Sequence, residues 1–515
     1  MYDFPLLSSL IILPAAAAIL IMLFEIIIKQ FNLPSCINFI KTFTLVVSVK
    51  VLLLTIILLF NFDHSQWMQF IEEYKWLEFD DLKINIIFGI DGIALSFILL
   101  TAIIIPISIL ASWSYIKEKV PLYFALILFT ESILMGFFSS LNIVFFYIFF
   151  EAILIPMLLI IGIWGGKDKI YATYKFFIYT FSGSVLMLIA IIYIAIQECD
   201  PLENTICTGY VCDTSYIVTL GGFIKEQFWQ GQGWVWWFIF IGLAVKVPMW
   251  PLHRWLPKAH VEAPTGGSMI LAGILLKMGG YGMLRLLIDP FPRLSAQFSD
   301  IVIIISIIGM IYTSLIAFVQ EDMKQLIAYS SIAHMGYVTA GIFSGTPNGV
   351  SGAIIQMISH GLISPALFFI VGLLYERMHT REIKAYGGVA KVMPQLAIFF
   401  MLQMLSSIGL PGTSGFIGEF ATIVAGVEKN LYYGLLMSTG VVLSAVYMLK
   451  LYGKVMLHNT KANCKALIDL SYREWSILAI LTVLMLILGI YPSIMTMYFA
   501  KSLEFFGQFY HMSGK

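Results

Sequence analysis

The sequence is poor in charged residues. Only 12% of its 515 residues are Asp, Glu, Lys or Arg, whereas 60% are hydrophobic, and the mean hydropathy is +0.91. A soluble domain is about a quarter charged and about half apolar, so this composition excludes a water-soluble globular protein. Lys plus Arg equals Asp plus Glu at 30 each, which leaves no basic footprint for nucleic acid.

Cysteine and cofactor motifs are also scarce. Five cysteines without a CxxC pair argue against a zinc or iron–sulfur site. The sequence contains no GxGxxG, GxxxxGK[ST] or HExxH, so we find no nucleotide-binding or zinc-protease motif. A single pair, His334 and His360, is too sparse to predict haem ligation. We therefore expect no cofactor in this chain.

What the sequence does contain is a series of long apolar stretches. A helix needs about 20 apolar residues to cross a bilayer, and stretches of this length recur from end to end. We place fourteen of them at roughly 6–28, 39–62, 90–114, 121–141, 143–163, 176–197, 235–255, 265–288, 300–320, 325–343, 352–375, 395–424, 432–456 and 474–497. We interpret the first as a retained span rather than a signal peptide, because it lacks a basic start. The predicted fold is an all-α integral membrane protein.

The basic residues between these stretches predict the orientation. Connections after odd-numbered segments carry 18 Lys and Arg residues, and those after even-numbered segments carry 5. The positive-inside rule places the first set on the inner face, so both termini are expected on the outer face. The polar insertion 197–233, with Cys199, Cys207 and Cys212, is then also outside. A disulfide is permitted there, and free thiols are the equal alternative.

Seven ionisable residues interrupt the predicted spans. They are Glu131, Glu151, Lys246, Lys277, His334, His360 and Glu419. An ionisable side chain at mid-membrane costs about 2.5–3.5 kcal/mol on insertion scales, so such residues are usually paired, hydrated or functional. A single one is as well explained by packing or by a static ion pair. Seven of them, both acids and bases, distributed over segments 4 to 12, favour a path for protons.

Helix breakers accompany two of these residues. Lys246 is followed by Pro248, and Glu419 is preceded by Pro411 and Gly412, which predicts interruptions in the seventh and twelfth spans. Interrupted helices in matching places mark inverted-repeat transporters. We therefore expect two inverted five-helix repeats, of segments 4–8 and 9–13. The predicted divisions are 1–114 for helices 1–3, 121–288 and 300–456 for the repeats, and 474–515 for helix 14 and the tail.

At these segments the sequence resembles a known family. The stretches AVKVPMWPLHRWLPKAHVEAPTGGSMILAGILLKMGGYGMLR, DMKQLIAYSSIAHMGYV and LPGTSGFIGEF are similar to the subunit 4 family of respiratory NADH:ubiquinone oxidoreductase (complex I), an antiporter-like membrane subunit, in its mitochondrial form. The resemblance runs from GIDGIAL at 89–95 to the fourteenth segment. It is poor over 1–88 and 197–233.

The resemblance implies roles for the buried ionisable residues. It implies an ion pair of Glu151 with Lys246, a central lysine at Lys277, and connecting histidines at His334 and His360. Glu419 matches the family's terminal carboxylate, and it favours subunit 4 because sister subunits 2 and 5 carry lysine there. Glu151 would then modulate Lys246, Lys246 would exchange its proton with Lys277 through the histidines, and Glu419 would be the group at which the proton enters or leaves.

The implied function is proton translocation driven by quinone reduction elsewhere in the complex. FMN, iron–sulfur clusters and ubiquinone would lie in partner subunits. The expected partners are the antiporter-like subunits 2 and 5 as neighbours, accessory subunits and membrane lipid including cardiolipin, without nucleic acid. The expected location is the mitochondrial inner membrane, with both termini on the intermembrane-space side.

Two alternatives stay open at this point. A subunit of a multisubunit sodium/proton antiporter would share most of the motifs. A static scaffold would use the charges only to hold helices together. Lys50, inside the second predicted span, has no assigned role in any of these interpretations.

Overall fold

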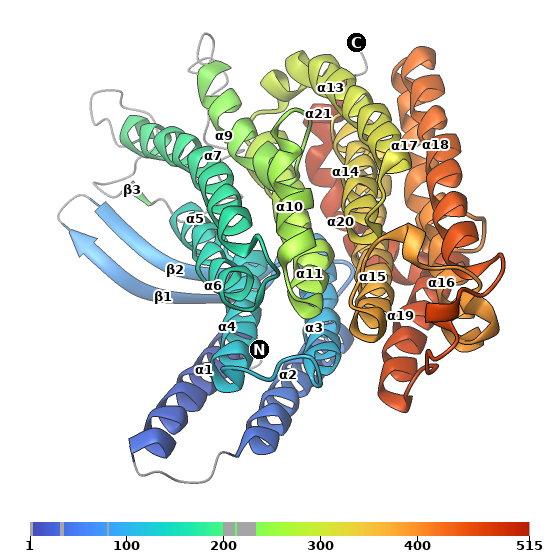
Figure 1. The fold of residues 1–515 in the computed structure, drawn as a ribbon. Coiled ribbons are helices and arrows are strands. Elements are labelled where there is room, and N and C mark those ends of the chain that lie inside the picture. Colours follow the sequence, from blue (N-terminus) through green and yellow to red (C-terminus); the bar gives the residue numbers. More distant parts are fainter. Residues whose placement is uncertain (1–3, 31–35, 80–81, 199–211, 214–232, 514–515) are drawn as a thin grey trace.

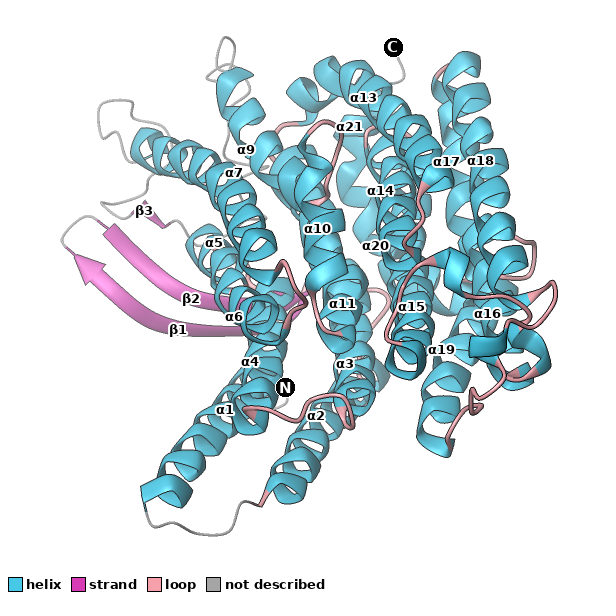
Figure 2. Cartoon of the chain, viewed as in Figure 1, coloured by secondary structure: helices cyan, strands magenta, loops and turns pink. Residues whose placement is uncertain are grey.

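The computed structural model describes residues 4–30, 36–79, 82–198, 212–213 and 233–513. These residues form a bundle of helices that lie side by side, with one β-hairpin projecting from its edge (Figures 1 and 2). The all-α membrane class is confirmed. The expectations for Cys199 and Cys207 fall outside the described residues.

The first part of the chain, up to Ile288, forms the elements from α1 to η3. Its helices are α1 (Leu6–Gln30), α2 (Ile37–Phe60), α3 (Gly92–Ser112), α4 (Val120–Ser139), α5 (Ile143–Ala152), α6 (Leu154–Trp164), α7 (Lys169–Glu198), α9 (Gly233–Lys246), α10 (Trp255–Glu262), α11 (Thr265–Ile270) and α12 (Leu276–Met283). A 3-10 turn, η1 (Leu252–Arg254), precedes α10, and two π-helical turns, η2 (Leu271–Leu275) and η3 (Leu284–Ile288), flank α12.

The second half continues the bundle to the C-terminal end. Its helices are α13 (Pro292–Val319), α14 (Met323–Ile342), α15 (Pro347–Met378), α16 (Pro394–Ile408), α17 (Ser414–Lys429), α18 (Leu431–Met456), α19 (Tyr472–Ile490), α20 (Ser493–Leu503) and α21 (Gly507–Ser513).

Helices occupy every stretch in which the sequence predicts a span. By length and composition, 11 helices among the described residues could cross a membrane, and α9 and α16 are shorter apolar helices. These two are short because each span is interrupted where its prolines and glycines lie. The total of fourteen spans and the repeat boundaries stay predictions.

The sequence pattern does not indicate the β-hairpin. Strands β1 (Gln69–Phe79) and β2 (Leu82–Ile90) pair antiparallel, and the short β3 (Cys212–Asp213) pairs parallel to β2 (Figure 2). The register shifts between Gln69 and Glu72 and between Lys75 and Leu77, as at β-bulges. The hairpin ends next to Asp91, whose carboxylate accepts a hydrogen bond from the N–H of Ala94 and so caps α3.

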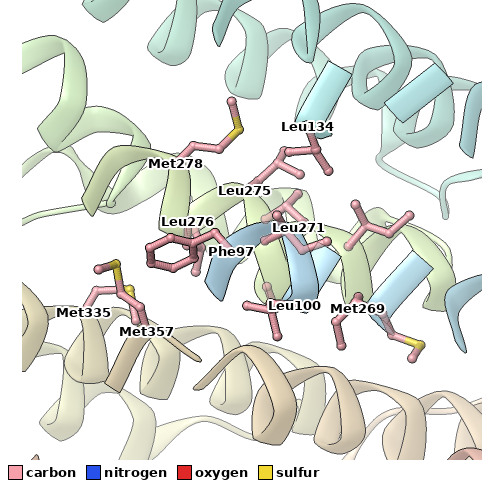
Figure 3. Packing of buried hydrophobic residues seen from close by; sticks show 14 of the residues in the cluster. Phe97, Leu100, Leu134, Met269, Leu271, Leu275, Leu276, Met278, Met335 and Met357 are labelled. Carbon is pink, nitrogen blue, oxygen red and sulfur yellow. The ribbon is translucent and has the colours of Figure 1, made fainter. Parts of the chain in front are cut away.

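The core lies where α3, the α11–η3 segment and α15 meet. Figure 3 shows Phe97 and Leu100 of α3 against Leu271 of η2, with Met357 of α15 close by. These side chains are all at most 2% exposed. The most apolar part of α15 is entirely buried, as is that of Thr265–Ile288, so lipid cannot be what these two segments face. Ionisable residues on them are therefore enclosed by protein.

Candidate functional site

Lys246 is the last residue of α9, where the prolines that follow end the helix. The C-terminal end of a helix favours a positive charge. Its Nζ donates to the carbonyl oxygen of Phe150 at 3.0 Å and lies 4.1 Å from the centre of the Phe150 ring. The side chain is 2% exposed, so its ammonium group is held by protein alone.

Glu151 follows Phe150 in the chain, but its carboxylate forms no hydrogen bond with Lys246. It is the penultimate residue of α5, which ends before Ile153, and its Oε1 is buried without a hydrogen-bond partner in the described part of the chain. The carboxylate and Lys246 attract each other electrostatically, yet no ion pair within 4.0 Å joins these two described residues. The structure thus places the two groups as neighbours, with the lysine on the backbone carbonyl beside the carboxylate.

Lys277 lies at the start of α12, directly after the π-helical turn η2, and is fully buried. A π-helical turn displaces backbone carbonyls from their usual partners and often occurs at functional sites. Here Lys277 Nζ contacts the carbonyl oxygen of Ala272, inside η2. It also lies 2.8 Å from Nδ1 of His360 on α15. Lysine and imidazole therefore share a hydrogen bond across two helices.

His360, His334 and Glu419 continue this contact through three helices. The His334 and His360 ring centres are 5.7 Å apart. His334 Nδ1 lies 2.7 Å from Glu419 Oε1, and its Nε2 lies 3.2 Å from the hydroxyl of Ser407. Gln356 donates to the same Oε1 at 3.1 Å. The groups form one buried row from α12 through α15 and α14 to α17.

A small cavity opens along this row. The space that a water centre can occupy in it is about 10 Å³, which is close to room for one water molecule. Its polar lining consists of Ser330, Ser331, His334, Gln356, His360, Ser364, Ser406, Ser407 and Glu419. A cavity of this polarity suits a water that links the two imidazoles.

Glu419 follows the second helix interruption. Helix α16 ends at Ile408, and Gly409 caps it with a left-handed φ of 87°. Gly412 also has a positive φ, of 89°, before α17 begins at Ser414. These two glycines allow the turn that brings Glu419 back to face His334. The carboxylate is 3% exposed.

Glu131 is not brought into the row. It is fully buried on α4, and its Oε1 accepts a hydrogen bond from Ser48 on α2 at 3.1 Å. Its Oε2 has no partner in the described residues. The structure therefore separates this carboxylate, at the interface of the N-terminal helices, from the six other predicted residues.

His260 on α10 is a candidate that sequence reasoning missed. The ring is fully buried, stacks on Phe368 at 4.3 Å, and has no hydrogen-bond partner for either nitrogen among the described residues. Lys324 and Lys277 are the charged groups that act on it electrostatically. Lys324 is itself held by protein, since its Nζ donates to the Ala263 carbonyl at 2.5 Å.

Part of this arrangement had a signal in the sequence. Gln356 precedes His360 by one helical turn, so both lie on the same face of α15 and line the same cavity. His260 had no comparable signal, because it follows a run of prolines and basic residues that is typical of a loop. In the described part of the chain, no group of three or more His, Cys, Asp and Glu residues is arranged to hold a metal ion.

Comparison with known proteins gives consistent results. A family model described as "NADH:quinone oxidoreductase/Mrp antiporter, TM" matches residues 140–446. "NADH-quinone oxidoreductase subunit M" of Rickettsia typhi is 47% identical over 98% of this chain and 99% of its own length. "NADH-ubiquinone oxidoreductase chain 4" of Marchantia polymorpha is 40% identical over 95% and 94%.

A solved structure agrees with these relatives. A chain of "Respiratory complex I from Thermus thermophilus with bound NADH" superposes with a TM-score of 0.85 at 27% identity, over 99% of this chain and 100% of that one. The resemblance noted from the motifs is thereby confirmed. Since the family model covers more than half of the chain and the Rickettsia relative matches nearly all of it, the chain belongs to the NADH:quinone oxidoreductase/Mrp antiporter transmembrane family.

Proposed function

We propose that this chain is a proton-translocating subunit in the membrane arm of an NADH:quinone oxidoreductase. The similarity to the Rickettsia and Marchantia subunits and to a chain of the Thermus complex supports this assignment. The observation that carries the mechanism is the row of contacts from Lys277 to Glu419. Each contact joins titratable groups on different helices, and every member is at most 4% exposed.

The proposed transfer begins at Lys277 and ends at Glu419. When Lys277 donates to His360 Nδ1, the ring's other nitrogen carries the hydrogen and faces the polar cavity. If the ammonium passes its proton to Nδ1, the imidazole can release the Nε2 proton into the cavity toward His334. His334 then holds the proton against Glu419, so a carboxylate accepts it at the far end. Each step moves one proton between adjacent groups.

Lys246 and Glu151 would control access to the row. In the structure Lys246 donates to the Phe150 carbonyl rather than to the adjacent carboxylate. A small rotation of the lysine stem would exchange this neutral acceptor for an anionic one, and the charged lysine would become more stable. Opening the pair would release the proton toward Lys277, on the neighbouring α12. His260 would provide a second connection, from Lys277 toward Lys324.

The test uses the assembled complex in sealed vesicles. NADH-driven proton uptake, measured per NADH oxidised, should fall for Lys277→Met and for His360→Gln, because each removes a member of the row. Ser359→Ala is the matched control, since Ser359 is buried beside His360 but pairs with Ser414 at 2.7 Å. A normal proton-to-NADH ratio in the assembled Lys277→Met complex would contradict the proposal and favour a scaffold.

The energy source would lie in other subunits. FMN, iron–sulfur clusters and ubiquinone would be bound there, and quinone reduction would drive the opening and closing of the Glu151 and Lys246 pair. We expect the antiporter-like subunits 2 and 5 as neighbours, with accessory subunits and lipids such as cardiolipin around them. Within this chain, 121–288 and 300–456 would act as the two inverted repeats.

The orientation is proposed from the loop charges, with both termini and the 197–233 insertion outside. Thiol labelling should reach Cys199 and Cys207 from that side alone, and labelling only after rupture of the membrane would reverse the orientation. The mitochondrial inner membrane is supported by the Marchantia relative, whereas the Rickettsia relative supports a bacterial one. In either, the chain is a multi-pass membrane protein.

The rival function is a subunit of a multisubunit sodium/proton antiporter. It is favoured by the family description, which includes the Mrp antiporter. Copurification separates the two: flavin, iron–sulfur clusters and quinone in the purified complex support the oxidoreductase. A redox-free complex whose proton movement requires sodium would support the antiporter.

A further inference from the structure

Helix α2 carries a lysine on its outward face. The helix lies beside α1 at the edge of the bundle, and only a third of its most apolar stretch is buried in this chain (Figure 1). Val46, Val49, Leu53 and Ile57 are exposed and follow each other at helical spacing. Lys50 is exposed within this stripe. The outward stripe of α2 is thus apolar apart from one cation.

Lys50 lies near the middle of the apolar helix α2. It is 13 residues from Ile37 and 10 from Phe60, the ends of the helix, which correspond to about 20 Å and about 15 Å along the axis. The packing of α2 on α4 gives the same depth, because Ser48, two residues before Lys50, donates a hydrogen bond to Glu131 near the middle of α4. The four-carbon stem of a lysine covers much less than either distance. Its ammonium group therefore cannot reach the membrane surface by extending along the helix.

Nothing in the described part of this chain pairs with Lys50. No hydrogen bond or ion pair joins it to another described residue, in contrast to Lys41 of the same helix, which donates to the Trp113 carbonyl at 2.7 Å. A charged residue at this depth is stable when it is paired or hydrated. A carboxylate on a neighbouring helix would form an ion pair with the Lys50 ammonium group. The flanking apolar residues of α2 would then pack against the same helix.

Other occupants of this face fit less well. A lipid offers its anionic group only at the surface, too far for the lysine stem. A second copy of this chain, packed by the same face, would bring two Lys50 side chains together, because a two-fold interface is self-complementary. We propose that the outward stripe of α2 docks a transmembrane helix of another subunit, which presents an Asp or Glu side chain to Lys50.

The first experiment maps what covers the stripe. A photo-crosslinking amino acid is placed at Val46 or Leu53 in the assembled complex, and at Val442 on exposed α18 as the comparison site. Irradiation should join Val46 and Leu53 to one membrane subunit, within a helix that has an acidic residue at the matching depth. Adducts to lipid alone, or to a helix without such a residue, would overturn the proposal.

The second experiment tests the charge. Lys50→Glu should lower the recovery of this chain with the complex by about tenfold or more, because two carboxylates would then face each other. Lys50→Arg should keep the association, and Lys465→Met, an exposed lysine in a loop, is the control. Exchange of the mapped partner carboxylate for lysine should restore assembly of the Lys50→Glu chain. Normal recovery of the Lys50→Glu complex would refute the pairing.

Discussion

The loop between α16 and α17 offers a matched test of how Glu419 is positioned. Gly409 and Gly412 both adopt left-handed φ angles, of 87° and 89°. A Cβ on Gly409 would lie 3.1 Å from Glu419 Oε2, whereas a Cβ on Gly412 would meet no atom within 4 Å. Gly409→Ala and Gly412→Ala therefore impose the same backbone strain but differ in their contact with the carboxylate.

The expected magnitudes follow from this difference. A left-handed alanine costs about 1–2 kcal/mol, so both variants should be destabilised by a similar, modest amount. Only Gly409→Ala displaces Glu419, whose Oε1 is held at 2.7 Å by His334 and at 3.1 Å by Gln356. Loss of a hydrogen bond to a charged group is worth about 1.5–3 kcal/mol. If the rate depends on that contact, transfer slows by about tenfold or more.

The assay compares the two variants in assembled complex reconstituted into vesicles. The initial rate of NADH-driven proton uptake is normalised to the amount of complex, and thermal unfolding is followed in parallel. We expect similar losses of thermal stability and a much slower uptake for Gly409→Ala alone. Equal uptake by both variants would show that the position of the Glu419 carboxylate does not limit transfer, and the proposed terminal role would fail.

Three further predictions concern other parts of the molecule. Glu151→Gln should stop proton uptake and slow quinone reduction, whereas Glu151→Asp should retain partial activity; equal and normal activity of both would contradict the switching pair. His260→Phe keeps an aromatic ring to stack but removes both nitrogens, so uptake should fall without a change in assembly, as native gels would check. Asp91→Asn leaves Arg285 buried without its ion pair and should cost about 3–5 kcal/mol of stability, measured by thermal unfolding.

The spans could be predicted because a membrane-spanning helix requires a continuous apolar run, which is visible in the sequence. Lipid selects runs of apolar residues of a fixed length, so hydropathy alone locates the spans, although α7 begins at Lys169 and α13 at Pro292, seven and eight residues before the predicted starts. The residues at which the helices begin and end are harder to predict. Helix α15 runs past its apolar part to Met378 because Arg377 pairs with Glu474 of α19 at 2.8 Å, a contact between distant segments. The hairpin was missed because the apolar half of β2 resembles the start of the next span.

The buried ionisable residues were visible for the same reason, since a charge inside an apolar run is costly wherever it occurs. Their partners were not visible. Nothing in the sequence indicates that Lys277 meets the Ala272 carbonyl, because that depends on a π-helical turn. The sequence also does not indicate that Glu131 accepts a hydrogen bond from Ser48 instead of joining the row from Lys277 to Glu419. Separation of Glu131 requires the packing of α2 on α4, which is a property of the fold.

The distribution of unpaired atoms argues against a static scaffold. A network built only to hold helices together is most stable when every buried polar atom has a partner, because each unpaired one costs free energy. Here Glu151 Oε1, His360 Nε2 and Glu419 Oε2 are buried and have none among the described residues. The three atoms belong to members of the predicted proton path. A group that binds and releases a proton needs an atom that no other protein group occupies, and these three groups each have one, as Glu131 and Asp91 also do outside the row.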